Sequence, residues 1–204
     1  DAKGESYLCE LSLRKGVLRR VTRGASLIND VVFDAEDKKA AMLITPPESA
    51  ADIHIIEVDS GNQKKMTYSN DDYFKKHPAA KIKKFTLQRK GMDIQSRLFL
   101  PPNFDSNQKY PLIVDIHGGP HGAFYDTFNP IQQILATTGY LVLAVNPRGS
   151  STYGMDHLKA VISDWGGEDY LDVLYAVDRT INYAYVDESR LGIMGYSYGG
   201  YLAA

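Results

Sequence analysis

The sequence predicts a mixed α/β chain, in which a β-rich front precedes a section of alternating strands and helices. Short apolar or alternating runs, separated by turn residues, fill the first 70 residues. From Phe85 onward, continuous apolar runs alternate with stretches that can form helices. This change of pattern predicts two structural parts within one chain.

Six short strands are predicted in the front part. They span residues 7–13, 17–22, 30–33, 40–44, 52–58 and 64–67. An internal echo is also present, since Glu10-Leu11, Gly16 and Val21-Thr22 recur as Glu57-Val58, Gly61 and Met66-Thr67, at offsets of 47, 45 and 45 residues. Propeller blades repeat every ~40 to 50 residues, and a generic β meander is the alternative. The matching loop phase favours the blades of a β-propeller.

Residues 69–84 form a polar connector that carries several lysines, with a short helix predicted over 71–76. We therefore expect the boundary here, with a first domain over 1–75 and a second over 76–204. The lysines could bind a polyanion. A solvated linker and a lysine-guarded edge strand fit better, because neither interleaved aromatic residues nor overall basicity accompanies them.

The second part is predicted to be an α/β sheet with helices on both faces. Its strands are expected at 85–89 and 94–100, which form a hairpin, and at 111–117, 140–145 and 190–194; its helices are expected at 126–138 and 168–182. The last helix places Leu171, Leu174, Val177 and Ile181 on one face.

Composition excludes several classes of protein. The 204 residues are 44% hydrophobic and 24% charged, as in an ordinary globular protein, and the net charge of −2 favours neither nucleic acid nor an anionic membrane. No apolar run is long enough to span a bilayer. A single cysteine, Cys9, suits a reducing compartment, so we expect the cytoplasm. The first residues, Asp1 to Glu5, resemble neither a start site nor a signal peptide, and we expect a fragment of a longer protein.

The strongest chemical motif is Gly195-Tyr196-Ser197-Tyr198-Gly199, which matches G-x-S-x-G. It directly follows a predicted buried strand and precedes the apolar Tyr201-Leu202-Ala203-Ala204. On a tight strand-to-helix turn, glycines two residues before and after the serine avoid a collision across the turn. The alternative, a glycine-rich connection with an incidental serine, explains this context poorly. Ser197 is therefore the predicted nucleophile.

A second motif, His117-Gly118-Gly119-Pro120, lies at the carboxyl end of another predicted buried strand. Glycine there lets the backbone approach a substrate closely, so the backbone N–H groups of Gly119 and Tyr198 are the predicted oxyanion donors. His117 and His121 could instead suggest a metal pair. Gly118-Gly119-Pro120 between them will not form a helix, so we expect no metal.

A third motif, residues 146–154 (NPRGSSTYG), follows the predicted strand 140–145 and opens on the same side of the sheet. Arg148 could bind a substrate carboxylate or brace loops. We favour bracing, to Asp164, Asp169 or Asp172.

Together, HGGP, NPRGSSTYG, the stretch DWGGEDYLD at 164–172 and LGIMGYSYGGY at 191–201 resemble the prolyl oligopeptidase family of serine peptidases, in particular its acylaminoacyl-peptidase-like branch. The resemblance covers about residues 80–204 and rests on the order and spacing of four motifs. It implies that the β-rich front is the last blades of a β-propeller and that the first part of an α/β-hydrolase domain follows, with the propeller restricting the site to short peptides. It also implies no cofactor, with Ser197 as nucleophile and Gly119 and Tyr198 as oxyanion donors.

The resemblance departs from the family pattern after the nucleophile. In this fold the triad order is Ser, then Asp or Glu, then His, and no histidine follows Ser197. The acid and base should lie beyond residue 204, so we expect an active parent serine peptidase and an inactive, incomplete fragment. A carboxylesterase on the same fold and a noncatalytic propeller-type binding module remain the alternatives. Oligomerisation stays open.

Overall fold

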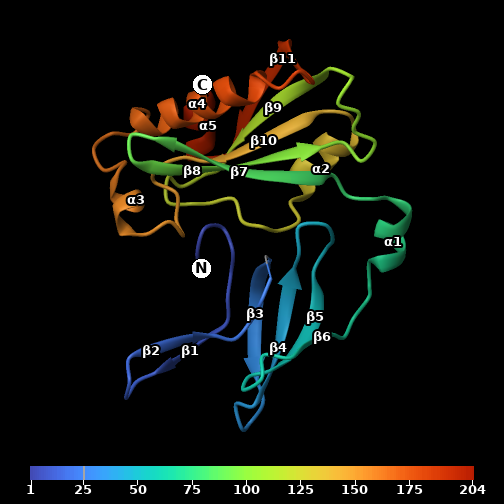
Figure 1. The fold of residues 1–204 in the computed structure, drawn as a ribbon, viewed down its shortest axis with the longest axis vertical. Coiled ribbons are helices and arrows are strands. Elements are labelled where there is room, and N and C mark those ends of the chain that lie inside the picture. The colour runs from blue at the N-terminus through green and yellow to red at the C-terminus, as the bar shows by residue number, and fades with distance from the viewer. Residues whose placement is uncertain (25) are drawn as a thin grey trace. The chain divides into compact units, whose positions relative to one another are not determined.

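The computed structural model describes residues 1–24 and 26–204, which divide into two compact units. The first unit comprises Asp1–Pro78 with Tyr125–Phe128, and the second comprises Ala79–Phe124 with Asn129–Ala204. Strands and helices alternate in the second unit, while the first is mostly strand (Figure 1). The predicted mixed α/β class is confirmed. Among the described residues, no helix combines the length and apolarity needed to cross a membrane.

The described residues of the first unit form two antiparallel sheets and one short helix. Its elements are β1 (Cys9–Ser12), β2 (Val17–Arg20), β3 (Leu27–Phe33), β4 (Lys39–Thr45), β5 (Asp52–Glu57), β6 (Gln63–Lys65) and α1 (Asp71–Lys76). Strands β1 and β2 pair as a hairpin, and β3 to β6 form a four-stranded meander in chain order. On β4, alternate residues Ala40, Met42 and Ile44 are buried, as expected for a strand with one face on a core.

The second unit is built on a five-stranded sheet in the order β11-β9-β10-β8-β7. Its strands are β7 (Lys81–Arg89), β8 (Met92–Leu100), β9 (Tyr110–Ile116), β10 (Leu141–Asn146) and β11 (Val186–Gly195). Strand β9 pairs in parallel with both β10 and β11, while β7 and β8 form the predicted antiparallel hairpin. Because the three parallel strands end at the same sheet edge, the loops that follow them meet there.

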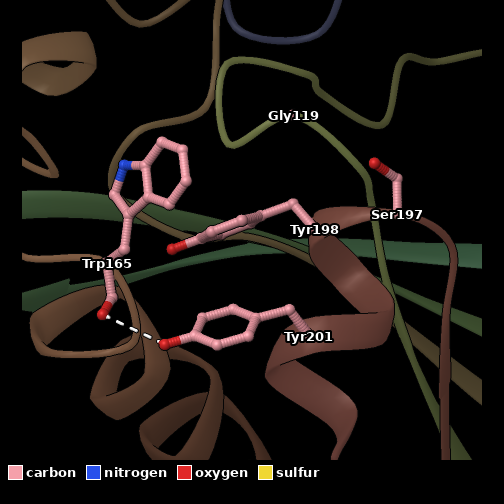
Figure 2. Close-up of a pocket in the computed structure, with 5 residues that line it drawn as sticks. All are labelled: Gly119, Trp165, Ser197, Tyr198 and Tyr201. Atoms are coloured by element: carbon pink, nitrogen blue, oxygen red, sulfur yellow. Dashed lines mark hydrogen bonds between the residues drawn. The ribbon is translucent and has the colours of Figure 1, made fainter.

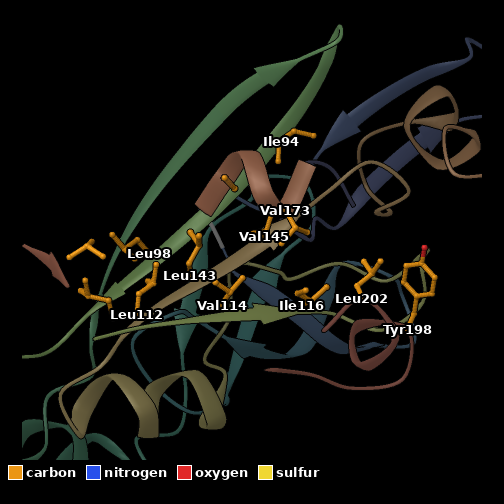
Figure 3. Close-up of a cluster of buried hydrophobic side chains, with 13 residues drawn as sticks. Ile94, Leu98, Leu112, Val114, Ile116, Leu143, Val145, Val173, Tyr198 and Leu202 are labelled. Carbon is orange, nitrogen blue, oxygen red and sulfur yellow. The ribbon is translucent and has the colours of Figure 1, made fainter. Parts of the chain in front are cut away.

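Helices cover both faces of this sheet. The helices are α2 (Pro130–Thr137), α3 (Met155–Lys159), α4 (Glu168–Ile181) and α5 (Tyr198–Ala203). Strand β10 is buried on both sides: Leu141, Leu143 and Val145 belong to one core cluster, and Val142 and Ala144 to another. The first cluster includes residues of α4 and α5 (Figure 3), and the second includes Ala136 of α2. A strand buried on both faces reads as the continuous apolar run seen in the sequence.

Two predicted helices differ in detail from the structure. Helix α2 begins at Pro130 and not at residue 126, because Asn129 has extended backbone and its side chain caps the helix by accepting from Ile131 N–H at 3.1 Å. In α4 the predicted apolar face is only partly right. Leu171 and Leu174 are exposed, whereas Asp169 and Asp172 are fully buried beside the core.

Candidate active site

Ser197 sits on a sharp turn between β11 and α5, with φ 56° and ψ −120°. A non-glycine residue in this positive-φ region is strained, and such strain persists only where the surroundings impose it. The flanking glycines make the turn fit. A Cβ on Gly195 would lie 2.3 Å from the carbonyl carbon of Gly199, and one on Gly199 would lie 1.9 Å from the carbonyl oxygen of Ile116. The elbow therefore packs directly against its own backbone and the end of β9.

The glycine loop after β9 lies over Ser197. A Cβ built on Gly118 would be 3.3 Å from Ser197 Cβ and 3.9 Å from Ser197 Oγ. The following residue, Gly119, has φ 133°, a backbone conformation in which any residue with a side chain would be strained. Among the residues that the structure describes, neither the Gly119 nor the Tyr198 backbone N–H donates a hydrogen bond. The structure thus brings Ser197 together with the loop that carries Gly119, and leaves two N–H groups unused.

A pocket of about 490 Å³ opens beside Ser197. The pocket is lined by Gly119, Trp165, Ser197, Tyr198 and Tyr201. Figure 2 shows the three aromatic rings close together, with the Ser197 side chain on the other side of the start of α5. The Trp165 and Tyr198 rings meet edge to face at 5.4 Å, and the Tyr201 ring lies 5.5 Å from that of Tyr198. The pocket therefore offers aromatic surface next to the serine hydroxyl.

The Tyr198 side chain is buried and held at its hydroxyl. The phenol donates a hydrogen bond to Asp169, a fully buried carboxylate in the first turn of α4, and accepts one from the Gly166 N–H at 3.2 Å. Burial and, next, the hydrogen bond to Asp169 raise the pKa of Tyr198 far above its usual range. The phenol therefore remains a donor throughout the physiological pH range.

The loop that carries Gly119 is tied to the loop after β10. His117 Nε2 lies 2.8 Å from Ser150 Oγ, and the Ser150 hydroxyl donates to the Pro147 carbonyl at 2.6 Å. His121 Nδ1 lies 3.0 Å from the Gly149 carbonyl oxygen. His117 Nδ1 also lies 2.8 Å from the Gly118 carbonyl oxygen, and burial lowers the pKa of His117. Both histidines are thus engaged in bracing, and the described residues contain no cluster of three or more metal-ligating side chains.

Arg148 ties the loop after β10 to α4, which is the bracing role predicted from the sequence. Its Nε donates to Asp172 Oδ2 at 2.7 Å and its terminal nitrogen to Asp172 Oδ1 at 2.9 Å. Arg89 also donates to Asp172 Oδ1, at 2.9 Å, and to Glu168 at 2.8 Å. Of the three predicted carboxylate partners, Asp172 is the one that Arg148 binds, so its guanidinium is paired and does not face the pocket as a free cation.

The second unit supplies no histidine to Ser197 within its described residues. His117 and His121 contact Ser150 and Gly149, as above, and both ring nitrogens of His157 lie against backbone carbonyls, at 3.1 Å each. The Ser197 hydroxyl makes no hydrogen bond to any described residue of this unit. The described residues of this unit thus place Ser197 beside the Gly118-Gly119 loop, with the three histidines bonded elsewhere.

Sequence reasoning missed two parts of this arrangement. It did not anticipate that Trp165 and Tyr201 would line the pocket, nor that Asp169 would bind the Tyr198 phenol. The spacing of Asp169 and Asp172, three residues apart on a helix, was a usable signal, because such residues share one face.

A serine on a strained strand-to-helix turn, under a glycine loop at the carboxyl edge of a parallel sheet, is the arrangement typical of serine hydrolases with an α/β core. Comparison with known families narrows this class. Residues 126–204 match the Prolyl oligopeptidase family, which confirms the resemblance predicted from the four sequence motifs.

Similar proteins carry peptidase names. The chain is 32% identical over 190 residues to the "Uncharacterized peptidase YuxL" of Bacillus subtilis, covering 92% of this chain and 29% of that protein. It is 30% identical over 208 residues to "Dipeptidyl-peptidase 5" of Porphyromonas gingivalis, covering 98% and 29%. The solved acylaminoacyl peptidase of Pyrococcus horikoshii superposes with a TM-score of 0.89 at 27% identity, covering 99% of this chain and 32% of that one. The chain thus spans about three tenths of the length of these relatives.

Proposed function

We propose that the natural full-length protein is a serine-type peptidase that hydrolyses short peptides through an acyl-enzyme on Ser197. The observation that carries the proposal is the strained Ser197 turn under the Gly118-Gly119 loop, with two backbone N–H groups left unused. The match of residues 126–204 to the Prolyl oligopeptidase family and the peptidase names of the relatives support the same reaction class.

In the proposed mechanism, Ser197 Oγ attacks the peptide carbonyl carbon while its proton passes to a histidine base. The carbonyl electron pair moves onto oxygen, and the N–H groups of Gly119 and Tyr198 stabilise that oxyanion, each contributing about 3 kcal/mol in the transition state. Collapse expels the amine, which takes the proton back from the histidine. Water then attacks the acyl-enzyme by the same steps and releases the acid.

We also propose that the histidine base and its acid come from residues outside this chain. The three histidines of the second unit are engaged in other contacts. A serine without a base is a poor nucleophile, because its hydroxyl must lose a proton during attack. The 204-residue chain alone is therefore expected to be inactive.

For the architecture, we propose that residues 1–75 are the last part of a β-propeller and that residues 76–204 are the first part of an α/β-hydrolase domain. The four-stranded antiparallel meander β3 to β6 is the type of unit from which propeller blades are built, and the 45-residue echo agrees with it. The parallel strands β9, β10 and β11 with helices on both faces support the second assignment.

The test compares Ser197→Ala with the control Ser189→Ala in the full-length protein. Ser189 lies on the same strand, is exposed, and bonds only to nearby Asp187 among the described residues. We expect Ser197→Ala to abolish fluorophosphonate labelling and hydrolysis of peptide anilides, with the control retaining both.

Several results would contradict the proposal. Hydrolysis of short aryl esters without hydrolysis of peptide anilides would indicate a carboxylesterase. A wild-type protein that neither labels nor hydrolyses either substrate would indicate a binding module. Rapid labelling of Ser197 in the isolated 204-residue chain would show that the chain needs no outside base.

A further inference from the structure

The backbone N–H of Tyr198 is one of the two proposed oxyanion donors, and its direction depends on how this residue is held. The residue follows Ser197, whose positive φ is strained, and is the first residue of α5. The first N–H groups of a helix have no partner within that helix, so the helix ladder does not hold the N–H of Tyr198. A side-chain anchor therefore matters more here than in the middle of a helix.

The Tyr198 side chain has such an anchor at its far end. The ring is 8% exposed, and its hydroxyl is fixed between the carboxylate of Asp169 and the N–H of Gly166. Figure 2 shows the ring reaching from α5 toward the segment of Trp165, on the opposite side from the Ser197 hydroxyl. The phenol thus ties the start of α5 to the segment that precedes α4.

Asp169 is itself firmly placed. It is fully buried, and its second carboxylate oxygen accepts from the Tyr170 N–H at 2.9 Å. One turn later on α4, Asp172 is locked by Arg148 and Arg89, and Val173 packs in the core. The start of α4 is therefore a rigid support for the carboxylate, and a buried carboxylate in turn requires its partners.

We infer that Asp169 is a positioning residue, which aims the Tyr198 backbone N–H at the oxyanion by holding the Tyr198 phenol. Among the described residues, Asp169 hydrogen-bonds Tyr198 and Tyr170 but not Ser197, so its effect on the site passes through Tyr198. Misplacement of a reacting or stabilising group by about 1 Å can lower a rate by about 100-fold, so a loosened anchor is felt at the chemical step. The inference rests on the proposed peptidase function.

The experiment uses the full-length protein and three variants: Tyr198→Phe, Asp169→Asn and the double variant. We expect Tyr198→Phe to lower kcat by about 10- to 100-fold with KM changed less than about threefold. Asp169→Asn, which keeps an oxygen acceptor of the same shape, should lose less. The double variant should lose no more than Tyr198→Phe alone, because both changes act on the same hydrogen bond and Tyr198→Phe already removes it.

A second readout separates positioning from general loss of structure. A peptidyl aldehyde forms a tetrahedral adduct with Ser197 whose oxygen occupies the oxyanion position, whereas a product peptide binds without that adduct. We expect the aldehyde Ki to rise by the same factor by which kcat/KM falls, while the product Ki is unchanged. Tyr175→Phe is the matched control, since Tyr175 lies on α4 and its hydroxyl accepts only from Arg179 among the described residues.

The outcomes are distinct from those of the proposed function. If Ser197 labels and hydrolyses normally but Tyr198→Phe behaves like Tyr175→Phe, the inference is wrong and the function stands. The inference is also overturned if KM rises while kcat is unchanged, or if the effects of the two single changes multiply in the double variant. If Tyr198→Phe does not fold, an Asp169→Asn variant with unaltered aldehyde affinity overturns it. A wild-type protein without any hydrolase activity refutes the function and the inference together.

Discussion

The ion pair between Arg148 and Asp172 should hold the loop after β10 against α4. Both side chains are almost completely buried, at 7% and 0% exposure. Arg148→Met keeps most of the aliphatic stem, which packs like methionine, but removes the guanidinium. Asp172 then loses two side-chain hydrogen bonds, of 2.7 and 2.9 Å, and keeps those from the Arg148 backbone N–H and from Arg89.

The magnitude follows from what remains around Asp172. A hydrogen bond to a charged group contributes about 1.5 to 3 kcal/mol, so two of them set an upper range of about 3 to 6 kcal/mol. Breaking a buried ion pair on one side typically costs about 3 to 5 kcal/mol. Because Arg89 still compensates the carboxylate, the lower end applies. We expect about 3 kcal/mol of lost local stability, which corresponds to an equilibrium constant for local opening that is about 150-fold larger.

Hydrogen exchange of the full-length protein, read by mass spectrometry on peptides from segments 146–154 and 168–181, measures this change locally. Arg190→Met is the control, because Arg190 forms an exposed ion pair with Asp187 at 2.7 Å. Exposed pairs contribute about 0 to 1 kcal/mol, so the control should hardly alter exchange. An Arg148→Met variant whose exchange in both segments matches that of Arg190→Met would refute the account of the buried pair.

Two further predictions concern the elbow and the start of β11. Gly199→Ala should abolish Ser197 labelling, because its Cβ would lie 1.9 Å from the Ile116 carbonyl oxygen. Gly192→Ala, whose Cβ has an ordinary 3.7 Å contact, should label at the wild-type rate, and equal labelling of the two variants would contradict the packing. Hydrogen bonds from the Ser189 hydroxyl and then from Arg190 lower the pKa of Asp187 to about 2. Because this pKa is lowered, the stabilisation is present above the ordinary value of 3.8 and is lost as pH falls through about 2. A carboxyl NMR titration of Asp187 with a midpoint near 3.8 would contradict it.

Much of the secondary structure could be predicted because it depends on local patterns. The alternating pattern of β4 corresponds to a strand with one buried face, and the continuous apolar run of β10 corresponds to a strand buried on both faces. The helix at 71–76 matches α1. The error at the start of α2 arose because Asn129-Pro130 is a strong helix-start signal that the apolar pattern overrode.

The face of α4 could not be predicted from hydrophobicity. Counting apolar residues put Leu171 and Leu174 inside, whereas the structure buries Asp169 and Asp172 and exposes the two leucines. A carboxylate is buried only where donors from other elements satisfy it. Those donors, the phenol of Tyr198 and the guanidinium of Arg148, lie 29 and 24 residues away along the chain. A short stretch of sequence around α4 therefore does not show which face of the helix is buried.

The same contrast separates the parts of the candidate site. Ser197 and the glycine loop are visible in the sequence because a tight turn demands glycine at fixed offsets from the serine, a requirement local to a few residues. The groups that hold them are not local: Ser150 bonds His117 from another loop, and Asp169 bonds Tyr198 from another helix. Sequence motifs therefore mark where chemistry can occur. How well the two proposed oxyanion donors are aimed depends on buried polar contacts between elements, and a motif does not show these contacts even where it contains the residues that make them.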